Sequence, residues 1–547
     1  MNEHDVREIA FPRLTADQVA AVRRLAEPKT YPDGATIFAC GDRGFKFVVI
    51  LSGTVEIIDY SPGQPRTVVV HQPGEFTGDV DMLTGRPAVV SAVARGDCQV
   101  LEVGPNDLRR LIGEHPELGD LILQAFITRR HLLESSSGFV GCRVIGSRFS
   151  KDTFRVRDFL AKNRVPFTWV DLEADPVAQR LLEQFQVTEA DTPIVACGNK
   201  LLMKRPSNRE LADRFGIRQP LDGEMFDLVV VGAGPAGLAA AVYGASEGLS
   251  TVVLDALAPG GQAGASMRIE NYLGFPTGIT GRELTERATL QAQKFGARLT
   301  APVQAVALEA DGPLHCVRLD GGECVTGRCV LIATGAEYHR LQVPGLDRYE
   351  GLGVFYAATP VEAPGCRGKV AVVVGGGNSA GQGAVFLSEH AARVLLVVRR
   401  ADLAKSMSRY LIARIEATPN IEVLCQFEVT RLVGDDCLRA VELTNGATGA
   451  ARRVETPALF SFIGAAPRTD WLPDTIAKDR KGFLLTGPAA AATGRWAEKR
   501  PPFLLETTRP GVFAAGDVRL GSSKRVAAAV GEGSMAVQLV HEYMKER

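Results

Sequence analysis

The sequence predicts a multidomain protein with an N-terminal β-roll, a small α/β domain and two Rossmann-like α/β domains that bind dinucleotides. Three observations lead to this prediction. The chain has 547 residues, which favours three or four domains. Short apolar runs separated by turns fill the region before about residue 103, as in an all-β unit. Two glycine-rich loops follow after about residue 224, each between an apolar strand and a helix.

The composition narrows the possible classes of protein. The chain has 62 Lys+Arg against 63 Asp+Glu, which argues against nucleic acid as an obligate partner and against a disordered chain. Its ten cysteines include no C-x-x-C pair, so neither a metal site nor a disulfide framework is predicted. The charged N-terminus indicates a cytoplasmic protein with reduced thiols. Residues 228–246 are uncharged, but their glycine spacing is that of a nucleotide loop, so no membrane partner is expected.

The first domain is expected to span residues 1–138. Apolar runs on either side of Ser52-Gly53 predict a hairpin over 47–57, and a further strand follows at 67–70. Helical spacing over 108–134, interrupted near Pro116, predicts helices that close the domain before the Ser-rich linker 135–138.

A second, smaller domain is predicted over residues 139–218. The pattern reads as a strand at 143–147, a helix at 152–163 and a strand at 167–171. A helix over 176–185 and a strand at 192–195 complete this α/β unit.

The first glycine loop predicts a flavin or nicotinamide dinucleotide site. The strand 226–231 is followed by G-A-G-P-A-G and then by a helix, which places backbone N–H groups and a helix N-terminus against a pyrophosphate. A second strand ends in Asp255, where a carboxylate can bind a ribose diol. The loop residues are Gly232, Gly234, Pro235, Ala236 and Gly237.

The second glycine loop differs at the ribose position. The strand 369–374 leads into Gly375, Gly376, Gly377, Asn378, Ser379 and Ala380, and the next strand ends in Arg399-Arg400. Two guanidinium groups suit a 2′-phosphate, so NADPH is favoured over NADH. The alternative is a solvated arginine pair at a strand end. An acid at one site and arginines at the other suggest FAD at the first and NADPH at the second.

From Met225 to Arg547 the chain resembles the low-molecular-weight thioredoxin reductases. The resemblance rests on the two loops and on Gly260-Gly-Gln262, Glu270-Asn-Tyr272, Ala333-Thr-Gly335 and Gly511–Val518, in the family's order. It implies a split FAD domain (224–340 and 466–547), an inserted NADPH domain (341–465) and a homodimer. Further FAD residues implied are Gly261, Gln262, Asn271, Val303, Thr334, Gly335, Gly516, Asp517, Arg525, Val526 and Ala527, and further NADPH residues are Ile463 and Gly464.

The family's redox dithiol is missing from this sequence. Ala357 and Pro360 stand at the two cysteine positions and Val361 at the position of the acid, and none of them forms a thiolate. Cys366 is the nearest thiol and the candidate catalytic residue, as a displaced redox cysteine. The alternative for Cys366 is a small residue packed beneath the second Rossmann strand.

The two N-terminal domains carry weaker resemblances. Gly74–Asp79 and the early strands resemble cyclic-nucleotide-binding domains, which implies Gly78, Asp79 and Arg86 as possible ligands of a cyclic nucleotide, although Ala88 or Val89 stands near the family's phosphate-binding arginine. Residues 142–216 resemble a thioredoxin or glutaredoxin fold, with Thr192-Pro193 at the cis-proline site. Ser150–Thr153 stands where a C-x-x-C would lie, so we expect a redox-inert adaptor that occupies or imitates a thioredoxin docking site.

These observations predict an NADPH-dependent FAD oxidoreductase regulated by its N-terminal module. The expected chemistry is hydride transfer from NADPH to FAD, with a protein or small-molecule acceptor other than the usual dithiol. Two alternatives remain: a disulfide reductase that uses Cys366, and a non-enzymatic sensor of flavin state or nucleotide. No nucleic-acid partner is expected for any of the three.

Overall fold

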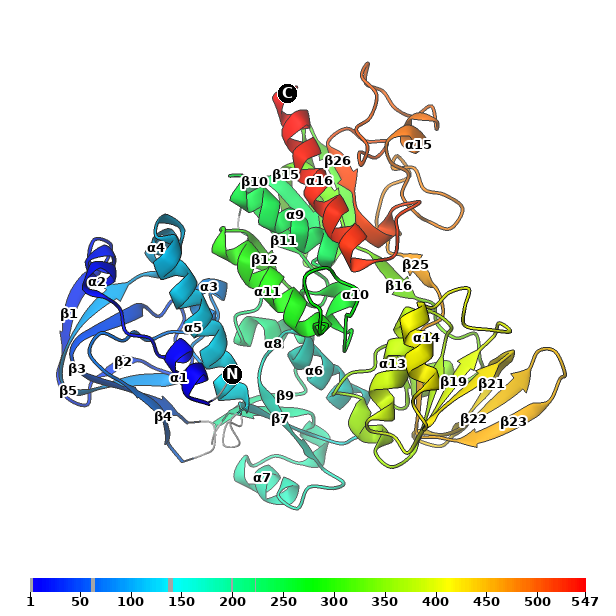
Figure 1. Ribbon diagram of the computed structural model, residues 1–547, viewed down its shortest axis with the longest axis horizontal. Coiled ribbons are helices and arrows are strands. Elements are labelled where there is room, and N and C mark those ends of the chain that lie inside the picture. The colour runs from blue at the N-terminus through cyan, green and yellow to red at the C-terminus, as the bar shows by residue number, and fades with distance from the viewer. Residues whose placement is uncertain (1–2, 61–63, 136–140, 198–199, 222) are drawn as a thin grey trace. The chain divides into compact units, whose positions relative to one another are not determined.

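The computed structural model describes residues 3–60, 64–135, 141–197, 200–221 and 223–547 (Figure 1). The predicted linker at 135–138 and the boundary after it therefore fall mostly outside the described residues. The chain forms two compact units, which are described separately. Unit 1 comprises residues 1–146, 163–220 and 290–302, and unit 2 comprises 147–162, 221–289 and 303–547. The boundaries of the four predicted domains stay a prediction.

The N-terminal part of unit 1 is a β-roll followed by helices. Its sheet has the order β1-β5-β3-β4, with β2 beside β5, and every pairing is antiparallel. The strands are β1 (Glu27–Tyr31), β2 (Thr36–Phe38), β3 (Phe47–Asp59), β4 (Arg66–His71) and β5 (Ser91–Val103). The helices are α1 (Glu3–Ala10), α2 (Ala16–Arg23), α3 (Asp81–Thr84), α4 (Pro105–Glu114) and α5 (Pro116–Ser135). The break between α4 and α5 falls at Pro116, as the sequence predicts.

The predicted hairpin around Ser52-Gly53 is wrong. Strand β3 runs without a turn from Phe47 to Asp59, and its register with β5 shifts on both sides of Ser52. Gly53 has φ +74°, and a Cβ there would lie 2.7 Å from the sulfur of Cys98. The glycine therefore serves a β-bulge within one long strand, because an extra residue in the ladder needs this backbone conformation just as a turn would.

Unit 1 also contains a small four-stranded sheet with the order β7-β6-β8-β9. β6 and β7 are parallel, and β8 is antiparallel to both β6 and β9. Its elements are β6 (Cys142–Gly146), β7 (Phe167–Asp171), α7 (Ala178–Gln184), β8 (Ile194–Cys197), β9 (Lys200–Lys204) and α8 (Asn208–Arg214). The predicted strand–helix–strand pattern is present and the Thr192-Pro193 bond is cis, but a thioredoxin-like identity stays a prediction. By its contacts α6 (Lys151–Lys162) belongs to unit 2.

Unit 2 contains two sheets, and each has a set of buried, valine-rich parallel strands. In the first, β11, β10, β15 and β26 are parallel, and β14 and β13 continue the sheet antiparallel beyond β15. Helix α16 packs against α9 beside this sheet (Figure 1). The elements of this part are β10 (Met225–Val231), α9 (Pro235–Ser246), β11 (Thr251–Leu254), α10 (Gly261–Gly264), α11 (Gly281–Lys294), β13 (Ala305–Asp311), β14 (Leu314–Leu319), β15 (Cys324–Ile332), α15 (Pro488–Ala491), β26 (Val512–Ala514) and α16 (Val526–Lys545). The short strand β12 (Arg298–Thr300) lies within residues 290–302, which belong to unit 1.

The second sheet of unit 2 lies between residues 354 and 461. It has the order β17-β24-β18-β19-β20 and is parallel throughout. Its elements are α12 (Leu346–Tyr349), β17 (Val354–Phe355), β18 (Val370–Val374), α13 (Asn378–Ser388), β19 (Arg393–Val398), α14 (Arg409–Glu416), β20 (Ile421–Cys425) and β24 (Ala458–Ser461), with the antiparallel β21 (Phe427–Gly434), β22 (Leu438–Asn445) and β23 (Ala451–Glu455). The chain enters and leaves this part through one antiparallel ribbon of β16 (Ala336–Tyr338) and β25 (Ala465–Pro467).

Two of the ten cysteines are bonded to each other. Cys316 and Cys324, on neighbouring strands β14 and β15, form a disulfide, so the expectation that all thiols are reduced is wrong for this pair. A spacing of eight residues carries no recognisable disulfide signature. Among the described residues, none of the helices has the length and apolar character needed to cross a membrane.

Candidate functional site: two dinucleotide loops and a segment without thiols

The first glycine loop joins β10 to α9 and is closely packed against backbone. Gly232 has φ +108°, and a Cβ there would lie 2.3 Å from the carbonyl oxygen of Ala333. A Cβ on Gly237 would lie 1.8 Å from the carbonyl oxygen of Gly232. At Gly234 the same position is open, with only the Cα of Gly261 as near as 4.0 Å among the described atoms. The backbone of the loop is therefore open at Gly234, at the N-terminus of the twelve-residue helix α9. This arrangement fits a pyrophosphate.

Asp255 ends β11 beside this loop, as predicted, and its carboxylate already accepts three backbone hydrogen bonds. Oδ2 accepts from the N–H of Ala233 at 2.8 Å, and Oδ1 accepts from Leu257 and Ala258, both at 2.9 Å. Burial raises the pKa of Asp255, while these N–H groups act in the opposite direction. The carboxylate therefore joins the first glycine loop to the turn at residues 257–258. Its contact with a ribose stays a proposal.

The other residues implied to bind FAD come from four segments. The N–H of Gly260 donates to the carbonyl of Ala233 at 2.8 Å, which brings the Gly260–Gln262 loop against the first loop. Gln262 donates to the carbonyl of Ala336, and the hydroxyl of Thr334 donates to the carbonyl of Arg468 at 2.9 Å. The N–H of Val303 donates to the carbonyl of Asp255 at 2.8 Å. Gly335 has φ +66° at the end of β15, and Asn271 is exposed in the loop after α10.

The late motif lies where α16 begins. Gly516 has φ +77°, and its N–H donates to Glu532 of α16 at 2.7 Å. Burial raises the pKa of Asp517. Arg525 is the residue that caps α16, and Val526 and Ala527 form its first turn. Helix α16, which packs against α9, thus begins at the late motif, and a helix N-terminus there fits a ligand with a negatively charged pyrophosphate.

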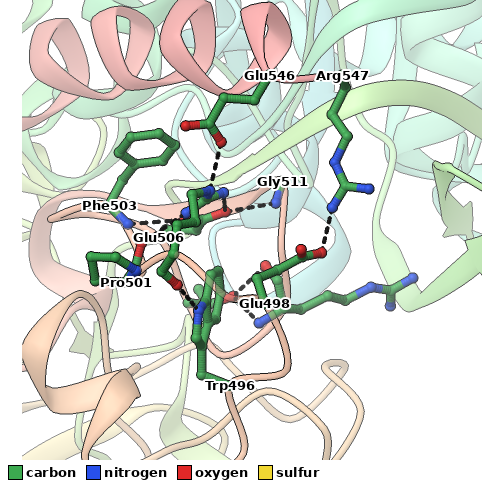
Figure 2. Close-up of polar contacts among 11 residues, drawn as sticks. Trp496, Glu498, Pro501, Phe503, Glu506, Gly511, Glu546 and Arg547 are labelled. Carbon is green, nitrogen blue, oxygen red and sulfur yellow. Dashed lines mark hydrogen bonds and ion pairs between the residues drawn. The ribbon is translucent and has the colours of Figure 1, made fainter.

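A buried ion pair holds the segment that leads into the late motif (Figure 2). The side chain of Glu506 is fully buried, and its carboxylate accepts from both terminal nitrogens of Arg500, at 2.7 and 2.9 Å. It also accepts from the N–H groups of Phe503 at 2.9 Å and Gly511 at 3.0 Å. Arg500 pairs in turn with Glu546, the residue that follows α16, at 2.6 Å. Because each charge has partners, the cluster fixes this segment against the C-terminal helix.

The second glycine loop joins β18 to α13. Gly375 has φ +142°, and a Cβ there would lie 2.7 Å from the carbonyl oxygen of Phe462. At Gly377 no described atom lies within 4 Å of the Cβ position. The side-chain amide of Asn378 donates to the hydroxyl of Ser408 at 3.0 Å, and the backbone N–H of Ser408 donates to Asn378 Oδ1 at 2.7 Å. This loop has the same form as the first and also fits a pyrophosphate.

Arg399 and Arg400 follow β19 directly, and both residues are exposed. The side chain of Arg399 is 82% exposed, and its nearest acid is Glu428 at 3.8 Å. Both guanidinium groups are therefore accessible to a charged group from solvent. The prediction of a 2′-phosphate contact fits this placement and stays a proposal.

Three of the predicted NADPH residues gather near the β16–β25 ribbon. Ile463 and Gly464 lie between β24 and β25, and the N–H of His339 donates to the carbonyl of Gly464 at 3.3 Å. Tyr338 hydrogen-bonds to Ser379 of the loop, and burial raises the pKa of its hydroxyl. The ring of Tyr338 meets that of Phe462 edge-on at 5.5 Å. Ala380, the last loop residue, is buried in the first turn of α13.

The segment that carries the family's dithiol has no thiol here and is contacted by α6. The ring of Phe154 on α6 packs against Phe355, with centroids 5.3 Å apart. Arg157 donates to the carbonyl of Val361 at 3.0 Å. Through these two contacts, α6 packs against the stretch that contains Ala357 and Pro360. The docking role expected for the small α/β module stays a prediction.

The burial of Cys366 argues against the redox role expected for it. Its side chain is fully buried in the apolar core that also includes Ala363 and Ala371, and burial raises the pKa of the thiol to about 12. A thiol that stays protonated at neutral pH and has no solvent access is a poor nucleophile. The structure therefore favours the alternative that Cys366 is a small core residue.

Glu362 is the acid nearest to the missing dithiol, and the sequence argument passed over it. Its carboxylate accepts hydrogen bonds from the N–H of Thr359 at 2.8 Å and from the Thr359 hydroxyl at 2.6 Å. Burial raises its pKa to about 7, and the negative charge of Asp158 on α6 contributes in the same direction. A proton on this carboxyl group is thus gained and lost near neutral pH.

Sequence reasoning also missed a pair of thiols in unit 1. Cys40 precedes the β-roll strand β3, and Cys197 ends β8, opposite Cys142 on β6. The Cys40 thiol donates a hydrogen bond to Cys197, which lowers the pKa of Cys197 to about 7, with Arg214 and Arg143 contributing. The two cysteines are 157 residues apart (197 − 40), so no local motif could have revealed the pair.

The residues implied to bind a cyclic nucleotide are only partly placed for it. Gly78 and Asp79 line a cavity in the β-roll, but the Asp79 carboxylate is paired with Arg130 of α5. Arg86 does not line this cavity and donates instead to the carbonyl of Asn163 at 2.8 Å. This placement does not support a phosphate contact by Arg86, and that role stays a prediction. In the part of the chain that the structure describes, no group of three or more His, Cys, Asp or Glu side chains could hold a metal ion.

The comparisons with known proteins agree with this geometry. The family model of pyridine nucleotide-disulphide oxidoreductases matches residues 226–533, and that of cyclic nucleotide-binding domains matches residues 28–115. The chain is 33% identical over 319 residues to a thioredoxin reductase of Treponema pallidum, which covers 58% of this chain and 97% of the relative. It is also 33% identical over 326 residues to a thioredoxin reductase of Bacillus subtilis, over 59% of this chain and 96% of the relative. The structure of T. acidophilum thioredoxin reductase matches with a TM-score of 0.53 and 30% identity, over 59% of this chain and 99% of that one.

The chain belongs to the pyridine nucleotide-disulphide oxidoreductase family, within which its relatives are thioredoxin reductases. It is an oxidoreductase with a cyclic nucleotide-binding domain at its N-terminus. Thioredoxin reductases use FAD and NADPH, and the two glycine loops with their open backbone faces fit these groups.

Proposed function

We propose that this protein transfers a hydride from NADPH to FAD and passes the electrons to an acceptor other than a dithiol at positions 357–360. The observation that carries the proposal is the contrast within unit 2. Both dinucleotide loops keep the packing that a pyrophosphate requires, whereas Ala357 and Pro360 replace the thiols and α6 contacts the same stretch.

The residues of unit 2 have distinct roles in this proposal. Gly234 and the start of α9 bind the FAD pyrophosphate, and Asp255 fixes the loop that carries them. Gly377 and the start of α13 bind the pyrophosphate of NADPH, and Arg399 and Arg400 select its 2′-phosphate. When bound, the two groups supply hydride chemistry at the nicotinamide and flavin rings.

The N-terminal half regulates this activity in our proposal. The support is the position of α6, which contacts the stretch 355–361 in unit 2 although it continues directly from β6 of unit 1. A change in unit 1 that pulls on α6 would alter the segment where the family exchanges electrons with its partner.

The test is an anaerobic NADPH titration of the purified protein in which the flavin spectrum gives the electrons taken up per FAD. Two electrons per FAD are expected, because the flavin is the only redox centre that the proposal uses. Rapid, repeated NADPH oxidation with one-electron dyes or quinones as acceptors would support an enzyme, whereas reduction that stops after one turnover would indicate a sensor.

Uptake of four electrons would contradict the proposal and return disulfide reduction as the function. Two cysteine pairs could then be responsible: the Cys316–Cys324 disulfide and the Cys40–Cys197 pair. Cys316→Ser and Cys197→Ser variants separate these sources, and Cys366→Ser serves as the control because that thiol is buried.

A further inference from the structure

The β-roll of unit 1 encloses a cavity of about 270 Å³ between its sheet and helix α5. Most of its wall is apolar. Phe38, Ile57, Val69, Ala88 and Leu133 contribute to it, from β2, β3, β4, the loop before β5 and α5. A cavity of this size and character suits a small ligand with an apolar body.

Arg129 of α5 forms part of the wall and carries a positive charge into this apolar surrounding. The residue is 9% exposed. Its Nε donates to the carbonyl of Ala10 at 2.6 Å and its Nη1 to the carbonyl of Gly78 at 2.9 Å. Its Nη2 is buried and has no hydrogen-bond partner within the described parts of the chain. Burial lowers the pKa of Arg129 to about 9, so the group is still charged at neutral pH.

A buried guanidinium donor without an acceptor is costly, and more so because the group is charged. The neighbouring acids do not remove this cost: Asp79 pairs with Arg130 and Glu75 with His71. The ring of Phe76 lies 4.6 Å from the Arg129 guanidinium and stabilises its charge, but a ring face does not accept a strong hydrogen bond from Nη2. An anion in the cavity would supply the missing acceptor.

The same wall is poorly suited to a cyclic nucleotide. A cyclic phosphate needs charged donors where this cavity has Ala88 and Val89. A ribose needs a free carboxylate, but that of Asp79 is paired with Arg130 and also accepts the N–H of Asp81 at 2.9 Å. The polar edges of a base would face Leu132 and Leu133 of α5.

We propose that the β-roll cavity binds a small molecule with one carboxylate on an apolar body, with the carboxylate held by Nη2 of Arg129. The apolar body fills the space between Phe38, Val69 and Leu133. This inference goes beyond the proposed hydride transfer and does not depend on it, because the ligand would bind in a cavity of unit 1.

Isothermal titration calorimetry on the full chain tests the proposal with octanoate as the probe. Octanoate is expected to bind saturably, and the neutral 1-octanol at least about tenfold more weakly, because a charge-assisted hydrogen bond contributes about 1.5–3 kcal/mol. Tighter binding of cyclic AMP or cyclic GMP than of octanoate would overturn the proposal. Equal binding of octanol and octanoate would also overturn it, since the charge would then be irrelevant.

Variants locate the binding in the cavity. Arg129→Gln removes the charged donor and is expected to weaken octanoate at least about tenfold while octanol is unchanged. Because Arg129 also supports the backbone at Ala10 and Gly78, Leu132→Trp provides a second test: it narrows the cavity from a partly exposed position and should abolish both ligands. Arg110→Gln, an exposed arginine on α4, is the control. Octanoate binding that survives Leu132→Trp would contradict the assignment.

Discussion

The aromatic ring of Phe154 on α6 packs against Phe355 of β17, with ring centroids 5.3 Å apart and planes inclined by 42°. Phe154 also lies beside Gly351, where a Cβ would come within 3.3 Å of its ring. Helix α6, which follows β6 along the chain, is thus fixed to the segment that contains Ala357 and Pro360.

Phe154→Ala should release the segment around residues 354–361. Loss of a large, partly buried ring costs about 2–4 kcal/mol of local packing, so amide hydrogens in this segment and in α6 should exchange faster. Hydrogen-exchange mass spectrometry measures this change. Phe154→Leu keeps an apolar contact and should stay close to wild type, and unchanged exchange in Phe154→Ala would show that the contact does not hold the segment.

Replacing Arg399 and Arg400 by Gln should weaken NADPH and leave NADH unaffected. Each charge-assisted contact with a 2′-phosphate contributes about 1.5–3 kcal/mol, so loss of both contacts should raise the KM for NADPH by at least about 100-fold. Steady-state kinetics with both nucleotides gives the ratio. Arg393→Gln, at the other end of β19 where it pairs with Glu422, is the control. A parallel loss with NADH would instead indicate a structural role for the pair.

Glu362→Gln should stabilise the protein above neutral pH. The pKa of Glu362 is raised from 4.5 to about 7 in the folded protein, so the folded state binds more protons than the unfolded state between these values. Stability is therefore lost as the pH rises through this window, by about 3 kcal/mol in total, and the loss is complete above pH 7.

Glutamine carries no charge and can still accept from the N–H of Thr359 and donate to its hydroxyl. The variant should be more stable than wild type at pH 8, with the difference vanishing near pH 4.5. Urea denaturation across this range measures it, and a difference that does not vary with pH would be inconsistent with titration of Glu362.

Cys197 should be the fastest thiol to alkylate at pH 7. The hydrogen bond from Cys40 lowers its pKa to about 7, and Cys142, Cys329 and Cys366 are buried. Cys40→Ala removes the donor and should slow iodoacetamide labelling of Cys197 by about tenfold, because the thiolate fraction falls. Cys40→Ser keeps an O–H donor and is the matched control. Peptide mapping gives the rates, and equal rates in the two variants would argue against the hydrogen bond.

Arg500→Ala should destabilise unit 2 and reduce its FAD content. Without the guanidinium, the carboxylate of Glu506 is fully buried with only N–H donors, and breaking such a pair costs about 3–5 kcal/mol. The double variant Arg500→Ala/Glu506→Gln removes the lone charge and should recover much of the loss. Denaturation and the flavin-to-protein absorbance ratio test both, and a double variant no better than the single one would place the effect in packing rather than charge.

The sequence predicted the architecture of unit 2 well because its signals are local. A valine-rich strand, a glycine loop and a helix follow one another within about thirty residues, and this order defines a dinucleotide site. A local signal leads to a wrong prediction at Gly53, where the glycine is typical of a hairpin turn. A positive φ occurs in a β-bulge as well as in a turn. A glycine indicates the local backbone conformation, but it does not indicate which strand the following residues pair with.

The features that sequence could not supply depend on contacts between distant residues. Cys366 was a candidate because it is near the missing dithiol in sequence, yet burial decides its chemistry. Cys197 acquires its acidity from Cys40, and Glu362 acquires its raised pKa from burial and from Asp158 on α6. Such properties arise from the folded surroundings of a side chain and leave no pattern along the chain.

The ribbon of β16 and β25 has a consequence for how this protein can be divided. Tyr338 and Ala465 are directly paired across it, so the 126 residues between them (465 − 338 − 1) leave and return at one point. A two-residue Asn-Gly turn between these positions would close the ribbon as an ordinary hairpin. Residues 339–464 are therefore a removable insertion. The part of unit 2 around the first glycine loop should keep its contiguous hydrophobic core once that insertion is deleted, and the shortened protein can be expressed and tested.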